Sequence, residues 1–413
     1  MSQPFPVSSG DTDRSVPTKV KLLIYSQVLN NFAFGYFLIY LTAYLVESGV
    51  FDAYQVGVIL GLETVIVIVA GIPIGILSDR KGRKKFLIFG NALIPAVLLI
   101  VSSTYDFDWF LLAAVLLGLA ESSSLGSWNA IIADQTHLGN RDSAFSRSFV
   151  VSNLFLSGGF AIPLALPSLQ EAFGLTAAQI HSGLFFWFGI FSIPVPLVIW
   201  MLLRGYHERS RALQEPERPG ELKLLLKFSA LNGIIGLGAG LIIPLLGSWF
   251  YYKFAVPDTF SGPFIALSNI TIAFAAVASP RLSKKYGLFN SILLTAGSST
   301  LFMFGMAFVP TVAIAGAVYL VRAALMNMAS PLLDSYLMGI VHSGRRGLGS
   351  AISAIVWRLP NSVTTVVGGF LLYTGYVAGN HFLYDLPWIL AAGLYVVGIG
   401  LLYYSFRNVK PRG

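Results

Sequence analysis

Long apolar segments alternate with short polar segments along nearly the whole chain. Most of the apolar segments have about 20 residues or more, the length that an α-helix needs to cross the ~30 Å hydrocarbon core of a bilayer. They recur twelve times, so the pattern predicts an all-α integral membrane protein with twelve transmembrane helices. The predicted spans are 20–47, 54–77, 85–104, 109–133, 143–167, 181–203, 223–250, 262–279, 289–308, 311–339, 348–374 and 386–405.

Composition agrees with this pattern. Of the 413 residues, 55% are hydrophobic and 11% are charged, and the mean hydropathy is +0.72. A soluble domain has about 25% charged residues, so this chain has too little polar surface to face water on all sides. Residues 1–18 are polar and lack the features of a cleaved signal peptide, which predicts a cytoplasmic tail. The chain has no cysteine, which excludes disulfides and thiolate metal sites.

The positive charges fall almost entirely on one side of the predicted membrane. Of the 27 Lys and Arg residues, 24 lie in the tails, in the even-numbered loops or at span ends beside them, whereas the other loops carry only Lys253. The positive-inside rule therefore predicts that both termini lie in the cytoplasm, and we expect a multi-pass protein of the plasma (inner) membrane. This distribution accounts for the net charge of +8 and argues against a nucleic-acid partner.

The two halves of the chain repeat each other. A shift of 205 residues brings Gly35 onto Gly240 and Gly82 onto Gly287 without any gap. This offset predicts a parallel duplication of a six-helix unit, an arrangement that places a substrate site at the membrane midplane between the halves. The predicted parts are a tail at 1–18, a six-helix bundle at 19–203, a cytoplasmic linker at 204–222 and a second six-helix bundle at 223–413.

One loop motif is specific enough to indicate a family. The segment 75–84 reads GILSDRKGRK and lies between the second and third spans, and 280–287 reads PRLSKKYG in the corresponding place of the second half. The first segment resembles the loop signature G-x-L-x-D-R-x-G-R-K of the major facilitator superfamily, and the second resembles a degraded copy. With twelve spans and a long central linker, the resemblance covers essentially the whole chain. It implies a secondary transporter in which two helical bundles rock about a central cavity.

The same resemblance implies a cytoplasmic gate. Carried over to this chain, it comprises Gly75, Asp79, Gly82, Arg83 and Asp134. Arg83 would pair with Asp134, and Asp79 would face the start of the eleventh span, where the helix dipole favours an anion. Such a latch would favour the state that is closed on the cytoplasmic side.

Two departures from the family pattern bear on the kind of substrate. Drug/proton antiporters usually carry G-x-x-x-G-P-x-x-G-G in the fifth span, and this region here reads VSNLFLSGGFAIPLALP. The arginine that they often place in the fourth span is also missing. Multidrug efflux by proton antiport is therefore the alternative, and transport of a small organic solute is favoured.

Four charged residues fall near the middle of the predicted spans: Glu63, Glu121, Arg322 and Arg358. A charge at the bilayer centre costs at least ~2.5–3.5 kcal/mol, so each needs a partner or a function. One interpretation is that the acids of the first half pair with the arginines of the second half and hold the closed cavity together. The other is that the arginines bind an anionic group of the substrate, because a guanidinium donates two parallel hydrogen bonds to a carboxylate or phosphate. The glutamates would then carry protons.

Asparagines form a second polar layer in the spans, at Asn31, Asn153, Asn232 and Asn327. We predict that they line the substrate cavity, with interhelical hydrogen bonding as the alternative.

The sequence gives no sign of enzymatic chemistry. The five histidines lie at loops or span ends without metal-ligand spacing, which predicts no metal site and no cofactor. A phosphate-binding G-x-x-x-x-G-K-[ST] loop is also missing, which argues against ATP-driven pumping. The expected partners are a small-molecule substrate, protons and the lipid bilayer, and we expect a monomer. A membrane receptor or scaffold that does not transport is the alternative of another class.

Overall fold

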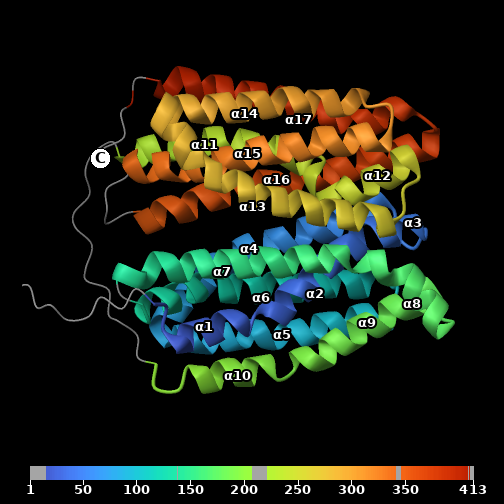
Figure 1. The fold of residues 1–413 in the computed structure, drawn as a ribbon, viewed down its shortest axis with the longest axis horizontal. Helices are drawn as coiled ribbons and strands as arrows, with labels where there is room; N and C mark the ends of the chain where they lie inside the picture. The colour runs from blue at the N-terminus through green and yellow to red at the C-terminus, as the bar shows by residue number, and fades with distance from the viewer. Residues whose placement is uncertain (1–14, 137, 207–220, 341–345, 408, 410–413) are drawn as a thin grey trace, which may run out of the picture.

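The computed structural model describes residues 15–136, 138–206, 221–340, 346–407 and 409. Within these residues the regular structure is helical throughout, and the helices form two bundles that lie side by side (Figure 1). α1 begins and α17 ends at the same end of the molecule, which we call the terminal end, and the opposite end is called the far end.

The first bundle contains six membrane-spanning segments, several of which are interrupted. Its helices are α1 (Thr18–Tyr25), α2 (Val28–Ile39), the π-helix η1 (Tyr40–Tyr44), α3 (Leu45–Glu47), α4 (Ala53–Lys81), α5 (Arg83–Ser103), α6 (Phe107–Asp134), α7 (Leu138–Ala161), the 3₁₀ helix η2 (Ile162–Ala165), α8 (Leu166–Phe173), α9 (Ala177–Ser192) and α10 (Val195–Leu202).

The second bundle repeats this order. Its helices are α11 (Glu221–Gly240), the 3₁₀ helix η3 (Ile243–Leu245), α12 (Leu246–Phe254), α13 (Asp258–Tyr286), α14 (Leu288–Gly305), the 3₁₀ helix η4 (Met306–Phe308), α15 (Val312–Ile340), α16 (Arg346–Ala378) and α17 (His381–Phe406).

The twelve-span architecture predicted from hydropathy is confirmed. Eleven helical segments of the described chain are long and apolar enough to cross a membrane, and α13 occupies the place of the remaining span. Several spans expected to be continuous are interrupted, including the first between α1 and α2, the fifth at η2, the sixth between α9 and α10, and the seventh at η3. Pro194 and Pro244 lie at the last two breaks. Proline interrupts a helix because it has no N–H to donate and its ring clashes with the preceding turn.

The two bundles are related by the predicted offset of 205 residues. α4 and α13 have 29 residues each, and both their first and last residues are separated by this offset. Each of these helices ends at a glycine with positive φ, Gly82 at 109° and Gly287 at 81°, a conformation that disfavours a side chain. The pseudo-symmetric pair of six-helix bundles is therefore confirmed.

The bundles contact each other through two equivalent helix crossings. α4 of the first bundle packs on α16, and α13 of the second packs on α7. A Cβ atom placed on Gly57 would lie 2.8 Å from the carbonyl oxygen of Thr365, and one on Gly262 would lie 2.4 Å from that of Phe160. Each residue of the first crossing is 205 positions from its counterpart in the second. Because glycine has no side chain, the backbones of the two helices can approach closely at each crossing.

Hydrogen bonds between the bundles gather at the far end. The N–H of Ala53 donates to the hydroxyl of Tyr252 at 3.1 Å, and the hydroxyl of Ser248 donates to the carbonyl oxygen of Thr42 at 2.6 Å. The largest hydrophobic cluster includes residues of both bundles. The bundles are therefore tightly joined at the far end.

Candidate functional site

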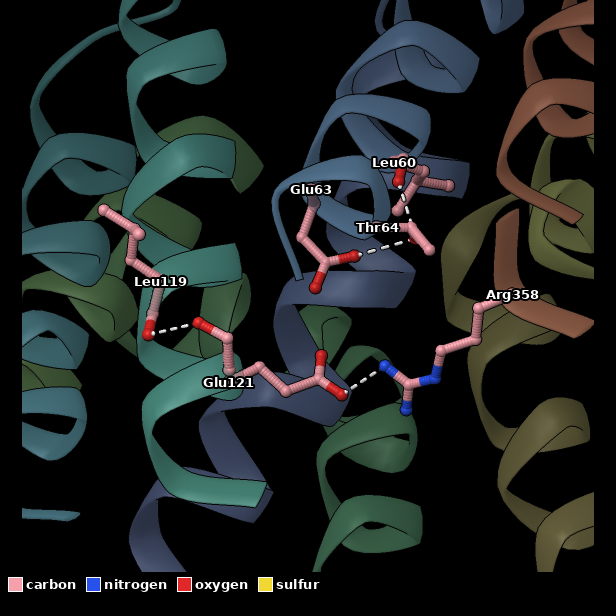
Figure 2. A network of polar contacts seen from close by, with 7 residues as sticks. Leu60, Glu63, Thr64, Leu119, Glu121 and Arg358 are labelled. Carbon is pink, nitrogen blue, oxygen red and sulfur yellow. Dashed lines mark hydrogen bonds and ion pairs between the residues drawn. The ribbon is translucent and has the colours of Figure 1, made fainter. Parts of the chain in front are cut away.

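An ion pair joins the two bundles between α6 and α16. Nη1 of Arg358 lies 2.7 Å from Oε1 of Glu121 (Figure 2). The two side chains are about equally exposed, at 32% and 31%, so the pair lies in a partly open space. Of the four mid-span charges, these two are the acid and base that the structure brings together.

Glu63 lies beside this pair but bonds differently. The hydroxyl of Thr64 donates to its Oε2 at 3.1 Å, and that hydroxyl also contacts the carbonyl oxygen of Leu60 (Figure 2). Oε1 of Glu63 is buried and has no hydrogen-bond donor within the described part of the chain. The side chain is in electrostatic contact with Glu121 and, more weakly, with Arg358. The site therefore combines two neighbouring carboxyl groups with one guanidinium.

Arg322 occupies a separate position in the second bundle. Its exposed fraction is 4%, and its Nη2 donates to the hydroxyl of Tyr395 at 3.0 Å. Its Nε is buried without a hydrogen-bond acceptor among the described residues. No ion pair joins it to a carboxylate of the described chain. The pairing interpretation thus holds for Arg358 and not for Arg322.

Two cavities adjoin the ion pair. The first, about 230 Å³, lies within the first bundle, and Glu121 is on its wall. The second, about 450 Å³, lies within the second bundle, and both arginines are on its wall. Glu121 bonds to Arg358, so one partner of this ion pair lies on the wall of each cavity. Together they form the candidate substrate site.

The four asparagines are distributed unequally. Asn31 lines the first cavity and donates to Ser152 at 3.3 Å, and Asn232 and Asn327 line the second. Asn153 lies in α7, where its amide donates to a backbone carbonyl one turn earlier, and it is on the wall of neither cavity. Sequence reasoning did not single out Asn30, Asn91 and Asn361, which also line the cavities.

A buried polar cluster at the far end was not predicted as a site. His181 of α9 is fully buried, and its Nδ1 lies 2.5 Å from the hydroxyl of Tyr36. Its Nε2 lies 3.5 Å from Oδ2 of Asp258, which belongs to the second bundle. The N–H of Asp258 donates to Glu47 of the first bundle at 3.0 Å. These residues lie near span ends, where a charge or a histidine is ordinary, so their burial could not be predicted from the sequence pattern.

The predicted gate lies at the terminal end and is only partly described. Nη1 of Arg83 lies 3.1 Å from Oδ2 of Asp134, which also accepts a hydrogen bond from the hydroxyl of Tyr206. Burial and this hydrogen bond raise the pKa of Tyr206 above its ordinary value, so the hydroxyl remains a donor at neutral pH. Gly75 lies in α4, and its Cα faces open space. The side chain of Asp79 and those at 346–351 lie outside the described part of the structure.

No group of three or more His, Asp or Glu side chains in the described chain is arranged to hold a metal ion. The site geometry instead offers carboxyl groups, a paired guanidinium, and a guanidinium without an acid partner among the described residues, around two cavities.

Comparisons with known proteins give the family. The family model described as Major Facilitator Superfamily matches residues 23–365. The chain is 25% identical over 299 residues to the multidrug resistance protein MdtG of Yersinia enterocolitica, an alignment that covers 68% of this chain and 69% of that protein.

Solved structures show the same fold at low sequence identity. The structure of the nucleoside transporter NupG has a TM-score of 0.70 at 13% identity, covering 95% of this chain and 100% of that chain. A bacterial homolog to the human lysosomal transporter Spinster, in an inward-facing and unoccupied conformation, gives 0.72 at 14%, covering 96% and 99%. The human organic anion transporter MFSD10 gives 0.65 at 16%, covering 94% and 100%. The chain therefore belongs to the Major Facilitator Superfamily and is a multi-pass membrane protein of this transporter family.

Proposed function

We propose that this protein is a proton-coupled secondary transporter that moves a small organic solute, preferably an anion, by alternating access. The observation that carries the proposal is the ion pair between Glu121 and Arg358, with Glu63 beside it. This pair bridges the two bundles, and its partners must separate or shift when the bundles move relative to each other. A charged contact at this position couples the state of the site to the conformation of the whole molecule.

The coupling follows from charge balance in a space of low dielectric. Two carboxylates and one guanidinium carry one excess negative charge, and the binding of one proton makes the group neutral. An uncompensated charge is costly inside the membrane, so the group favours a single bound proton while Arg358 remains paired. When the bundles separate, Arg358 leaves Glu121, and the preferred number of bound protons changes. Proton binding and bundle movement are thereby linked.

The preference for an anion rests on the second cavity, whose wall holds two arginines and no described carboxylate. One positive charge remains there after Arg358 is paired with Glu121. The structurally similar human protein MFSD10 is an organic anion transporter, which agrees with this preference, and its likeness to this chain is one of fold.

Multidrug efflux is the second candidate function. It is favoured by the likeness to the multidrug resistance protein MdtG and by the mainly apolar wall of the first cavity, which includes Phe34 and Phe37. A receptor or scaffold that does not transport is the candidate of another class.

We place the protein in the plasma (inner) membrane as a monomer without enzymatic activity, with the terminal end in the cytoplasm, because the basic residues concentrate there. In this orientation the tightly joined far end faces outward.

The test is a flux screen of organic acids, sugars and dyes in liposomes that contain the full chain, with and without a pH gradient. We expect the gradient to drive accumulation of organic acids. Glu121→Gln or Glu63→Gln should reduce this accumulation by about tenfold or more, because the amide cannot carry the proton. Glu171→Gln, on the exposed face of α8, is the matched control and should behave as the unmodified protein.

Each outcome bears on one candidate. Accumulation that survives in both glutamine variants rules out coupling through these residues. Flux of cationic or neutral dyes without flux of acids supports multidrug efflux. Binding of a solute without any flux supports a receptor.

A further inference from the structure

Arg322 is a buried cation whose charge is not balanced by the described chain. Its side chain is 4% exposed, and no described carboxylate forms an ion pair with it. Removing an ion from water is expensive unless it gains a partner of opposite charge and its hydrogen-bonding groups are satisfied. Arg322 lies on the wall of a cavity of about 450 Å³, which gives an external partner room to bind.

We propose that Arg322 binds the carboxylate of an amphipathic monoanion, while Arg358 stays paired with Glu121. The inference rests on the proposed function, because it assigns the substrate class and the anion-binding residue of the same site. It divides the roles of the two arginines, which the sequence alone left equivalent.

The hydrogen-bonding state of Arg322 supports this assignment. One terminal nitrogen, Nη2, donates to the neutral hydroxyl of Tyr395 at 3.0 Å, and Nε is buried without an acceptor among the described residues. A carboxylate is the usual partner of a guanidinium edge, because its two oxygens match two parallel N–H groups. The guanidinium carbon of Arg322 also lies 5.7 Å from the centroid of the Tyr395 ring, within the range of a cation–π contact.

Charge balance indicates a monoanion. Two charged side chains, Arg322 and Arg358, are on the wall of the second cavity. Glu121 bonds to Arg358 at 2.7 Å, so one positive charge remains to be matched. A dianion would bring an excess negative charge into the membrane interior, which is costly.

The rest of the cavity wall indicates that the bound anion has an apolar body with some polar edges. Trp357, Met326 and Ile243 give apolar surface to the cavity that Arg322 also lines, and three asparagines are on the same wall. A volume of about 450 Å³ falls within the range of small-molecule sites, ~300–1,000 Å³. The first cavity, whose wall is mainly apolar, lies in the other bundle, on the Glu121 side of the ion pair.

Arg358 is the less suitable anion-binding residue. Its guanidinium already donates to Glu121, and an arriving carboxylate would have to displace an existing partner and leave that acid unpaired. Arg322 has no such competitor within the described chain. The structure therefore separates an anion-binding arginine from a bundle-joining arginine.

The experiment measures binding to the purified full chain at one neutral pH with four probes: benzoate, its neutral analogue benzamide, the small anion acetate and the dianion terephthalate. Titration calorimetry gives the affinity of each. We expect benzoate to bind about tenfold or more tightly than each of the other three, a factor that corresponds to about one charged hydrogen bond. Arg322→Gln should remove the preference for benzoate over benzamide.

Two further variants keep the test decisive. Arg322→Lys retains the charge without the planar fork and should keep a reduced preference for benzoate, even where Arg322→Gln folds poorly. Arg281→Gln removes an exposed arginine at the end of α13 and should leave all four affinities unchanged. Folding of each variant is checked by its melting temperature.

The proposal is overturned if wild-type protein binds benzoate no more tightly than benzamide, if it binds none of the probes, or if folded Arg322→Gln keeps the full preference. A preference that disappears only in Arg358→Lys would also overturn it. These results do not depend on transport or on protons, so they are independent of the flux test with the glutamine variants of Glu63 and Glu121.

Discussion

Gly35 and Gly240 show how single residues hold each bundle together. A Cβ on Gly35 would lie 2.1 Å from the carbonyl oxygen of Leu156, and a Cβ on Gly240 would lie 2.1 Å from that of Asn361. The glycines are 205 residues apart, and so are the residues that they contact. Each bundle therefore brings a pair of helices together by the same close backbone approach, in which there is no room for a methyl group.

We predict that Gly35→Ala and Gly240→Ala each lower the free energy of unfolding by roughly 1–3 kcal/mol, because overpacking forces the helices apart. Gly297→Ala is the matched control, since no atom lies within 4 Å of the added Cβ. Melting temperatures in one detergent give the comparison. Equal melting temperatures for all three variants would show that the backbones tolerate the methyl group.

At the scale of helices, the far end is joined by several elements that meet around His181. The π-helix η1 and α9 form the side of the first bundle, and the first residue of α13, Asp258, reaches them from the second bundle. The ring of Tyr44, within η1, lies against the imidazole, with 3.9 Å between centroids and the ring planes tilted by 38°. A π-helical turn is uncommon and is often found at functional positions. This joint is a candidate outer gate.

We predict that Asp258→Asn weakens the far-end joint, because the contact with His181 loses its charge. The chain has no cysteine, so Met326→Cys on the wall of the second cavity is a background-free reporter. Labelling by a membrane-impermeant maleimide from the far side should increase severalfold in the Asp258→Asn background. Glu171→Gln, exposed on α8, is the control. Unchanged labelling would mean that helix packing alone closes this end.

At the scale of the whole molecule, the proposed alternating access requires the two bundles to move against each other, and contacts at opposite ends of the molecule would then favour opposite states. The far-end contacts described above favour a cavity that is open toward the terminal end. The predicted latch at the terminal end, built on Asp79, Arg83 and Asp134, favours the reverse. The balance between the two sets of contacts determines from which side of the membrane the cavity is accessible.

Asp79→Asn is therefore expected to shift the equilibrium toward the state open at the terminal end, since the loss of its charge weakens the latch. With the same Met326→Cys reporter, labelling from the terminal side should rise and labelling from the far side should fall, opposite to the effect of Asp258→Asn. Exposed Asp108→Asn on α6 serves as control. Cavity access that is identical with and without Asp79→Asn would refute a gating role for this residue.

The sequence by itself determined the features that depend on local pattern. Hydropathy gave twelve spans to within a few residues, since the thickness of the bilayer fixes the length of a helix. The offset of 205 residues gave the duplication, and the loop motif at 75–84 gave the family. The depth of Glu63, Glu121, Arg322 and Arg358 could also be predicted, because helix rise converts residue number into distance.

Only the tertiary structure decided which of these groups meet. Glu121 and Arg358 are separated by 237 residues, and their contact depends on the rotation and neighbours of α6 and α16, which hydropathy does not specify. The same is true of Arg322, whose lack of a described acid partner depends on which faces of α15 and α17 meet. It is also true of His181 and Asp258, which are buried only because the two bundles pack together there. Depth in the membrane is a property of position along one helix, whereas pairing across the membrane is a property of the packing of several.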